Sequence, residues 1–163
     1  MSEPTQPPTP PTSDPSNAQP QRELIRVVAA EVEEDGKFLL TQRRPQASFP
    51  LFWEFPSGRV EEGEEDADAL ARELQERLGV SVSVGECTMF VKQDYDDYTL
   101  DFYVYRCLIS HDEPLQKLKV NDWRWVSPQE MESYPFPPAD AHSIKRLLEG
   151  DAAQGEPQGG AEE

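Results

Sequence analysis

Hydrophobic and polar positions near the start of the chain alternate in the way that is typical of strands. Residues 24–33 and 37–41 are rich in β-branched and small apolar side chains, and Glu34, Asp35 and Gly36 separate the two runs. Turn residues between two such runs predict a β-hairpin. Further alternating runs predict more strands, at residues 80–84, 87–92, 98–109 and 122–126.

Residues 65–78 show a different pattern, with apolar positions three and four residues apart, as in a helix with one buried face. These positions are Ala67, Leu70, Ala71, Leu74 and Leu78. Acidic residues begin the segment, Arg77 ends it and Gly79 follows, in agreement with the helix dipole and with capping preferences. A capping box at residues 127–130 predicts a second helix, and residues 140–149 predict a third.

Residues 43–57 carry three prolines around four aromatic residues. This composition favours a long structured loop over a helix. Aromatic side chains on such a loop can line a pocket, and they can equally pack into the core. Two or three helices on a mixed sheet predict a layered domain of the α/β or α+β class.

Composition changes at both ends of the chain. Seven of the sixteen prolines lie within the first twenty residues, which contain no aromatic residue, Lys or Arg. Such a segment cannot bury enough apolar surface to offset the entropy of ordering, so we expect residues 1–21 to be a disordered Pro-rich tail. Residues 150–163 lack large apolar residues and predict a second, acidic disordered tail. One folded domain at residues 22–149 remains.

The formal net charge of −17 bears on partners and location. A negative field repels nucleic acid, so we expect no nucleic-acid polymer as a partner. The sequence has neither a signal peptide nor a run of about 18 apolar residues, so we expect no membrane association and a cytoplasmic location. We predict no protein partner. Cys87 and Cys107 lie in alternating apolar runs and are expected to be reduced core residues.

Residues 58–80 combine a turn glycine, a run of carboxylates and an Arg-Glu pair. At about 100° per residue, Glu73, Glu76 and Arg77 share one arc of the predicted helix, beside its apolar stripe. Carboxylates at the edge of a core are suited to a hard cation such as Mg²⁺, which keeps positions for water and phosphate oxygens. The alternative is a surface helix in which Glu73 and Arg77 form an i, i+4 ion pair.

The spacing of this segment resembles the Nudix box, Gly-x5-Glu-x7-Arg-Glu-U-x-Glu-Glu-x-Gly-U, where U is aliphatic. The matching residues are Gly58, Glu64, Arg72, Glu73, Leu74, Glu76, Gly79 and Val80. Residues 40–43, 53–56 and 137–140 are similar to the MutT-like branch of that family, which includes hydrolases of oxidised purine nucleotides and of cytidine triphosphates. The resemblance implies an α/β/α Nudix sandwich with a mixed sheet. It also implies Mg²⁺-dependent (or Mn²⁺-dependent) cleavage of a nucleoside triphosphate, or of an oxidised form, to monophosphate and pyrophosphate.

The resemblance also implies roles for individual residues. Glu73 would serve as base or metal ligand, Glu76 as a ligand, and Ser57 would offer its backbone carbonyl to the metal. Glu64 would assist through water, and Arg72 would orient the glutamates. The residues expected to contact the substrate are Arg43, Gly58, Phe55 and Asp140.

Several of these roles have simpler alternatives. Arg43 is also explained as a solvated residue at a strand end. Phe55, like Trp53 and Phe136, is a candidate for stacking on the base, and core packing explains each of them almost as well. Asp140 would read the base, where an ionised carboxylate accepts from an exocyclic amino group and so favours cytosine or its oxidised forms. Its alternative role is the N-cap of the last helix.

The sequence departs from the family pattern at two positions. Arg77 stands where the box has its second adjacent glutamate, and a guanidinium has donors only. Lys119 aligns with a further glutamate of many MutT-like enzymes, although Asp122 or Glu113 would substitute after a small shift. Two hypotheses follow: a nucleotide pyrophosphohydrolase with reduced activity, or a catalytically weak nucleotide-binding or regulatory module.

Overall fold

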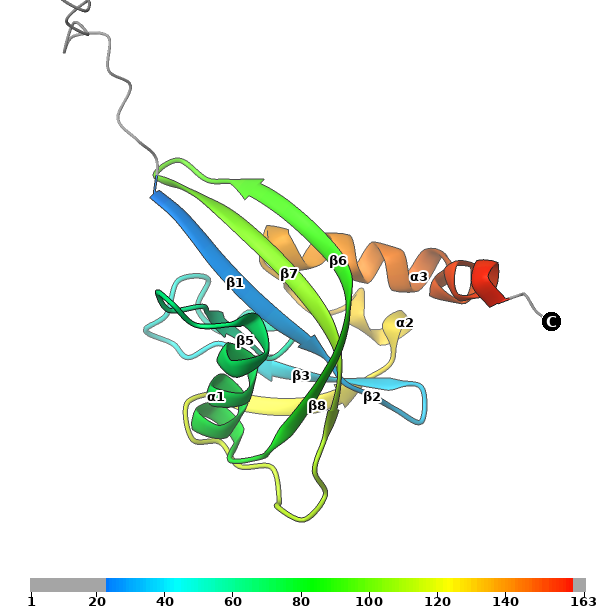
Figure 1. The fold of residues 1–163 in the computed structure, drawn as a ribbon, viewed down its shortest axis with the longest axis horizontal. Helices are drawn as coiled ribbons and strands as arrows, with labels where there is room; N and C mark the ends of the chain where they lie inside the picture. The colour runs from blue at the N-terminus through cyan, green and yellow to red at the C-terminus, as the bar shows by residue number, and fades with distance from the viewer. Residues whose placement is uncertain (1–22, 160–163) are drawn as a thin grey trace, which may run out of the picture.

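The computed structural model describes residues 23–159 and, in this range, the side chains up to Glu149 (Figure 1). The expected tail at residues 1–21 lies outside the described residues. The strands are β1 (Glu23–Glu31), β2 (Glu33–Glu34), β3 (Lys37–Gln42), β4 (Trp53–Glu54), β5 (Ser57–Arg59), β6 (Val82–Asp94), β7 (Tyr98–Ile109) and β8 (Asp122–Val126). The helices are α1 (Asp66–Leu78), α2 (Pro128–Met131) and α3 (Pro138–Gly159).

The strands form two sheets. The larger has the order β5-β1-β7-β6, in which β1 and β7 are parallel and the other pairs antiparallel, so this sheet is mixed. In the smaller, β3 pairs antiparallel with β2, β4 and β8. The predicted hairpin is confirmed, because Glu34 pairs with Lys37 across a turn in which Asp35 and Gly36 have φ of 53° and 78°.

Helices cover both faces of the larger sheet. Val28 and Ala30 of β1 belong to one core cluster, which includes Leu70 and Leu74 of α1. Ala29, between them in sequence, belongs to a second cluster with residues of α2 and α3. Successive side chains of a strand point to opposite faces, so α1 lies on one side of the sheet and α2 with α3 on the other. The α+β sandwich with a mixed sheet is confirmed (Figure 1).

Three local predictions differ from the structure. The runs at residues 80–84 and 87–92 form one strand, β6, whose register against β7 is irregular around Cys87. Gly85 lies in that irregular stretch, where an added Cβ would be 2.8 Å from the carbonyl oxygen of Arg106. The predicted loop at 43–57 contains β4 and the start of β5, on either side of Pro56. Cys87 is exposed and only Cys107, of the two, is buried.

The last helix also differs in its bounds. It begins at Pro138, two residues before the predicted start, so Asp140 lies in its first turn and is not its N-cap. It continues to Gly159, past the residue at which the sequence analysis ends the domain. The division of the chain into one domain and two tails stays a prediction.

The C-terminal end of α1 is fixed to the loop that precedes β8. Gly79 caps the helix in the left-handed conformation, with φ of 72°. The backbone N–H of Gln116 donates to the carbonyl of Leu78, and those of Leu118 and Lys119 donate to the carbonyl of Arg77. These bonds satisfy carbonyls that a helix end leaves unpaired, and they hold Lys119 beside Arg77.

No helix in the described part of the chain is long and apolar enough to cross a membrane.

A buried ion pair connects the sheet to α3. Arg146 of α3 donates through Nη2 to both carboxylate oxygens of Glu31 on β1, at 2.7 and 2.6 Å. The two side chains are 10% and 5% exposed. Thr88 of β6 donates to the same carboxylate at 2.6 Å. Because α3 carries Asp140, this pair also fixes one wall of the pocket described below.

We expect Arg146→Met to lower the free energy of unfolding by about 3 kcal/mol or more, because it leaves the Glu31 carboxylate buried without its cation. Urea denaturation followed by circular dichroism measures the change. Lys145→Met is the matched control, because Lys145 is an exposed neighbour on the same helix, and it should change stability by less than about 0.5 kcal/mol. Equal effects of the two variants would contradict a stabilising role for the pair.

Candidate functional site

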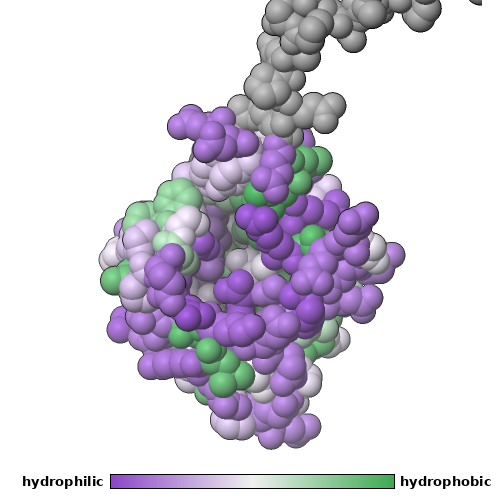
Figure 2. All heavy atoms as spheres, turned by 90° about the vertical axis from the view of Figure 1, so that its left-hand side faces the viewer, coloured by the Kyte–Doolittle hydropathy of each residue, from purple (hydrophilic) through white to green (hydrophobic). Residues whose placement is uncertain are grey.

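A pocket of about 200 Å³ lies where β1 and β7 meet the loop after β3, the β6–β7 turn and the first turn of α3. Figure 2 shows the side of the molecule that is on the left in Figure 1; this face is largely hydrophilic and is hollowed. Of the residues that the sequence assigns to metal or substrate, four line the pocket: Arg43, Ser57, Gly58 and Asp140.

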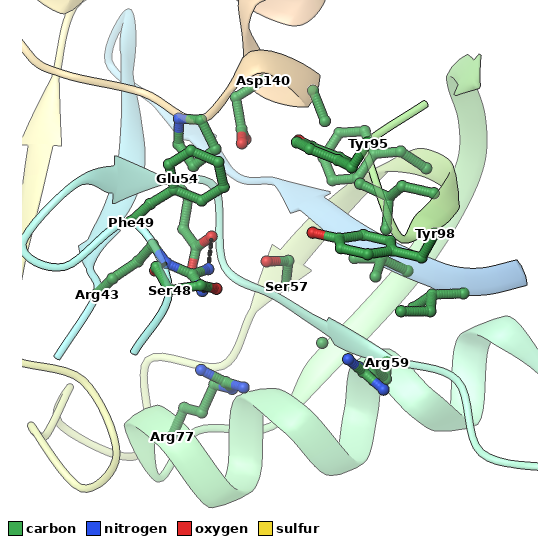
Figure 3. Close-up of a pocket in the computed structure, with 17 residues that line it drawn as sticks. Arg43, Ser48, Phe49, Glu54, Ser57, Arg59, Arg77, Tyr95, Tyr98 and Asp140 are labelled. Carbon is green, nitrogen blue, oxygen red and sulfur yellow. Dashed lines mark hydrogen bonds and ion pairs between the residues drawn. The ribbon is translucent and has the colours of Figure 1, made fainter. Parts of the chain in front are cut away.

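Three arginines line this pocket from different elements. Arg43 follows β3, Arg59 ends β5 and Arg77 lies near the end of α1. In Figure 3, Arg59 and Arg77 lie on one side of the cavity, opposite Asp140. Guanidinium groups remain charged and bind phosphate and carboxylate oxygens in a planar, bidentate manner. These three positive groups stand out in a chain that as a whole carries −17, although Arg43 and Arg77 are each paired with a carboxylate.

Arg43 also holds the loop that follows it. Its side chain donates to the Ser48 carbonyl oxygen at 2.5 Å and to Ser48 Oγ at 2.9 Å. Its Nη1 is 2.8 Å from Glu54 Oε1. The backbone of Arg43 bonds in addition to Phe52 and Leu51. Arg43 is therefore an organised, partly buried residue, and the alternative of a solvated strand end is wrong.

Two acidic groups lie deep in the same pocket. Glu54 and Asp140 are 7% and 3% exposed. Burial raises the pKa of both carboxyls, and the charge of Glu54 raises the pKa of Asp140 further, whereas Arg43 opposes both shifts. Among the described residues, Asp140 Oδ1 has no hydrogen-bond partner. A buried oxygen of this kind is available to a ligand, because leaving it unpaired is costly.

Arg72 organises the carboxylates of the box. It donates to both oxygens of Glu64, at 2.8 and 2.9 Å, to Glu73 Oε1 at 2.8 Å and to the carbonyl of Arg59 at 2.9 Å. The hydrogen bonds from Arg72 are the main cause that lowers the pKa of Glu64 to about 2. The geometry agrees with the expected orienting role of Arg72.

Glu73 is buried between two arginines. Its second oxygen accepts from Nε of Arg77 at 2.5 Å, so each carboxylate oxygen faces a guanidinium. The carboxyl group lies directly over Gly58, where an added Cβ would be 2.1 Å from Glu73 Cδ. Gly58 is thus required for the position of Glu73, in addition to lining the pocket.

Glu76 and Lys119 lie at the outer edge of this cluster. Glu76 Oε2 is 3.7 Å from Arg72 Nη1 and 3.9 Å from Lys119 Nζ. Glu113 bonds to Ser81, and Asp122 pairs with Lys117 and Arg124. Lys119 is the residue placed near Glu76, and its alignment with a family glutamate stays a prediction.

The resemblance implies a divalent cation held by the Ser57 carbonyl, Glu73 and Glu76. Both oxygens of Glu73 are used by guanidinium groups, and Glu76 lies near two cations. Within residues 23–149, no three His, Cys, Asp or Glu side chains are grouped so as to hold a metal ion. The side chains present therefore do not fit Mg²⁺ or Mn²⁺ in this arrangement.

The aromatic residues of the pocket are not those that the sequence analysis selected. Phe55 is completely buried and packs between Phe38 and Phe136, with ring centroids 6.3 and 6.5 Å away, so the core alternative applies to its side chain. Phe49, Tyr95 and Tyr98 line the pocket instead. The signal for the tyrosines was the Asp-rich turn at residues 94–98, where two aromatic residues sit in an otherwise polar sequence.

Phe49 and Tyr95 approach each other across the cavity from two separate segments, with ring centroids 6.2 Å apart. Tyr95 also stacks on Tyr98 at 4.8 Å. Phe49 adopts φ of 50°, an unusual conformation for an aromatic residue, and Leu51 adopts 64°. Such strain is concentrated at functional sites, and here it directs an aromatic ring into the pocket.

We expect Asp140→Asn to increase the free energy of unfolding more at pH 8 than at pH 5. A carboxyl whose pKa is raised on folding loses stability as the pH rises from its unfolded value through its folded value, and asparagine does not titrate. Urea denaturation at both pH values measures the difference. Asp96→Asn, at an exposed position, is the control for removing one carboxyl group from the chain. An equal effect of Asp140→Asn at both pH values would contradict the raised pKa.

Known proteins are similar to most of this chain. The family model described as the NUDIX domain matches residues 27–146. The chain is 35% identical over 131 residues to the CTP pyrophosphohydrolase of Escherichia coli K12, covering 80% of this chain and 96% of that protein. It is 31% identical over 128 residues to the 8-oxo-dGTP diphosphatase of Haemophilus influenzae, covering 78% and 93%.

A solved structure shows the same fold. The solution structure of the E. coli ORF135 protein superposes with a TM-score of 0.69 and 33% identity, covering 82% of this chain and 94% of that one. The match of the family model over most of the domain, together with relatives above 30% identity along nearly their whole length, shows the family. The chain belongs to the Nudix family and is a MutT-like Nudix hydrolase.

Proposed function

We propose that this Nudix hydrolase is a nucleoside triphosphate pyrophosphohydrolase of reduced activity, which converts a nucleoside triphosphate, or an oxidised form, to monophosphate and pyrophosphate. The observation that carries the proposal is a pocket next to the box, with Arg59 and Arg77 at one side, Asp140 opposite them, and Arg43 beside Glu54 and Phe49 (Figure 3). Relatives named as a CTP pyrophosphohydrolase and an 8-oxo-dGTP diphosphatase support it.

The basic side of the pocket fits the polyphosphate. Arg43, Arg59 and Arg77 bring three guanidinium groups to one cavity, which Gly58 also lines. Charge-assisted bonds from arginine to phosphate are about twice as strong as neutral hydrogen bonds. A triphosphate at this side would lie beside Ser57 and the carboxylate cluster.

The opposite side fits a base. Phe49 and Tyr95 offer faces for stacking, and Asp140 Oδ1 offers an unpaired polar atom. Burial raises the pKa of Asp140, so this carboxyl stays protonated to a higher pH than an ordinary aspartate does. A protonated carboxyl donates a hydrogen bond as well as accepting one. The preference for cytosine depended on an ionised Asp140 that only accepts hydrogen bonds, so a protonated Asp140 does not support it. The nucleotide panel described below identifies the base.

Reduced activity is proposed from Arg77 and Lys119. Nudix hydrolases generally use divalent cations, and the family expectation for this chain is Mg²⁺ or Mn²⁺. Two cations stand where the resemblance places carboxylates, and repulsion between each of them and a metal ion opposes binding. Glu73, expected to act as base or metal ligand, accepts hydrogen bonds from Arg72 and Arg77 on its two oxygens, so these guanidinium groups compete with a metal ion or a water molecule for the carboxylate.

A second candidate is a nucleotide-binding module with little turnover. The pairing of both Glu73 oxygens with guanidinium groups favours this candidate. These contacts occupy the carboxylate expected to act in catalysis and leave the nucleotide pocket intact. A cytoplasmic location and the absence of nucleic-acid, membrane and protein partners stay predictions under either candidate.

We expect slow pyrophosphate release when the full chain is incubated with Mg²⁺ or Mn²⁺ and a panel of nucleoside triphosphates that includes CTP and 8-oxo-dGTP. Arg77→Glu should increase the rate by about tenfold or more, because it restores a carboxylate beside Glu76. Arg106→Glu makes the same charge change at an exposed position outside the pocket and should not increase it. No turnover on any nucleotide, alongside clear binding, would favour the second candidate; a folded Arg77→Glu variant without a gain would contradict the account of Arg77.

We expect Tyr95→Leu to weaken nucleotide binding by about tenfold, since stacking on an aromatic ring contributes roughly 1–3 kcal/mol per base. Equilibrium dialysis with a labelled nucleotide measures the affinity. Phe90→Leu is the control, because Phe90 is a half-exposed aromatic residue of β6 that packs on Tyr103 outside the pocket. Unchanged affinity in Tyr95→Leu would place the base elsewhere.

A further inference from the structure

We infer that Arg77 and Lys119 supply, as part of the chain, the positive charge that a carboxylate-rich Nudix site obtains from divalent cations, and that Arg77 binds the phosphates of the nucleotide directly. The consequence is nucleotide binding that does not require a divalent cation. This inference rests on the proposed function in one respect, that the pocket takes a nucleotide.

The charges of the cluster give the first reason. Glu64, Glu73 and Glu76 are matched by Arg72, Arg77 and Lys119, and these groups contact one another in one network. Exchanging a carboxylate for a cation changes the local charge by about two units, so the two departures together change it by about four, roughly the charge of two divalent cations. With the exposed Glu61, 4.0 Å from Arg72, the cluster carries one net negative charge without a metal, whereas two carboxylates in place of Arg77 and Lys119 would leave it strongly negative.

The direction of the Arg77 side chain gives the second reason. Arg77 uses Nε for Glu73, and its Nη1 and Nη2 groups carry four further N–H donors. The side chain is 34% exposed and lines the pocket together with Arg43 and Arg59 (Figure 3). The charge of Arg77 also acts to lower the pKa of Glu54, which lies inside the pocket. The guanidinium is therefore directed towards the cavity.

Glu73 gives the third reason, because it fixes Arg77 in place. A buried carboxylate over Gly58 holds Nε at 2.5 Å, so the guanidinium is ordered before a ligand arrives. Binding then avoids most of the entropic cost of immobilising a long side chain. Lys119, 59% exposed and 3.9 Å from Glu76, adds charge at the rim and does not line the pocket. Of the two residues, Arg77 is the phosphate ligand.

The test is isothermal titration of the full chain with α,β-methylene CTP, an analogue that resists cleavage between the α and β phosphates, in EDTA and in Mg²⁺. We expect dissociation constants within about threefold of each other. In EDTA, Arg77→Gln should weaken binding of the analogue by about 10-fold to 100-fold, the range for a hydrogen bond to a charged group, and should leave binding of cytidine unchanged. Arg106→Gln, outside the pocket, is the matched control and should bind as the unaltered chain does.

The outcomes separate this inference from the proposed function. Binding in Mg²⁺ that disappears in EDTA would overturn the inference and leave a metal-dependent hydrolase. Equal affinity of Arg77→Gln and the unaltered chain in EDTA would overturn the role of Arg77. If the analogue and other nucleoside triphosphates bind under neither condition, the proposed function itself is wrong.

A second readout uses the metal alone. Titration with Mn²⁺, followed by electron paramagnetic resonance, should show weaker binding to the unaltered chain than to Arg77→Glu, in which a carboxylate replaces the guanidinium. The charge-matched Arg106→Glu variant controls for the change in net charge. If the unaltered chain binds Mn²⁺ as tightly as Arg77→Glu does, Arg77 does not take the place of a divalent cation and the inference fails.

Discussion

The position of one buried carboxylate organises the candidate site. Glu73 lies over Gly58 and accepts hydrogen bonds from Arg72 on one oxygen and from Arg77 on the other. A buried charge without partners would be very unfavourable, so the two arginines and the glycine are conditions for this arrangement. Arg72 also donates hydrogen bonds to Glu64 and to the backbone carbonyl of Arg59, and Arg77 lines the pocket. The box is thus one network of ionic hydrogen bonds before any ligand is considered.

The predictable parts of the molecule were those with strong local signals. The apolar spacing of residues 65–78, with Gly79 after them, defined α1 within one residue, and Ser127 to Glu130 form the capping box that the sequence indicated. The spacing of Gly58, Arg72 and Glu73 also placed the box correctly, because these residues act within one loop and one helix.

The predictions that differ from the structure concern residues whose positions depend on contacts between distant segments. Phe49 and Tyr95 are separated in sequence by α1 and most of β6, and only the fold brings their rings to one cavity. The composition of the loop also made Phe55 a candidate for stacking on the base. In the structure Phe55 follows β4, which pairs with β3, and its side chain is completely buried in the core. The irregular register at Cys87 likewise follows from pairing with β7, which periodicity along one strand does not report. The position of Lys119 near Glu76 likewise depends on the backbone bonds between its loop and the end of α1.

Arg43 shows how the shape of the pocket and its occupancy are connected. The same guanidinium that faces the cavity also bonds to Ser48, in the loop that carries Phe49, and to Glu54 of β4. A phosphate that recruits this group competes with the loop's own carbonyl and hydroxyl oxygens for the same N–H donors. The conformation of this loop and the binding of phosphate are therefore coupled, and a substitution of Ser48 would change both.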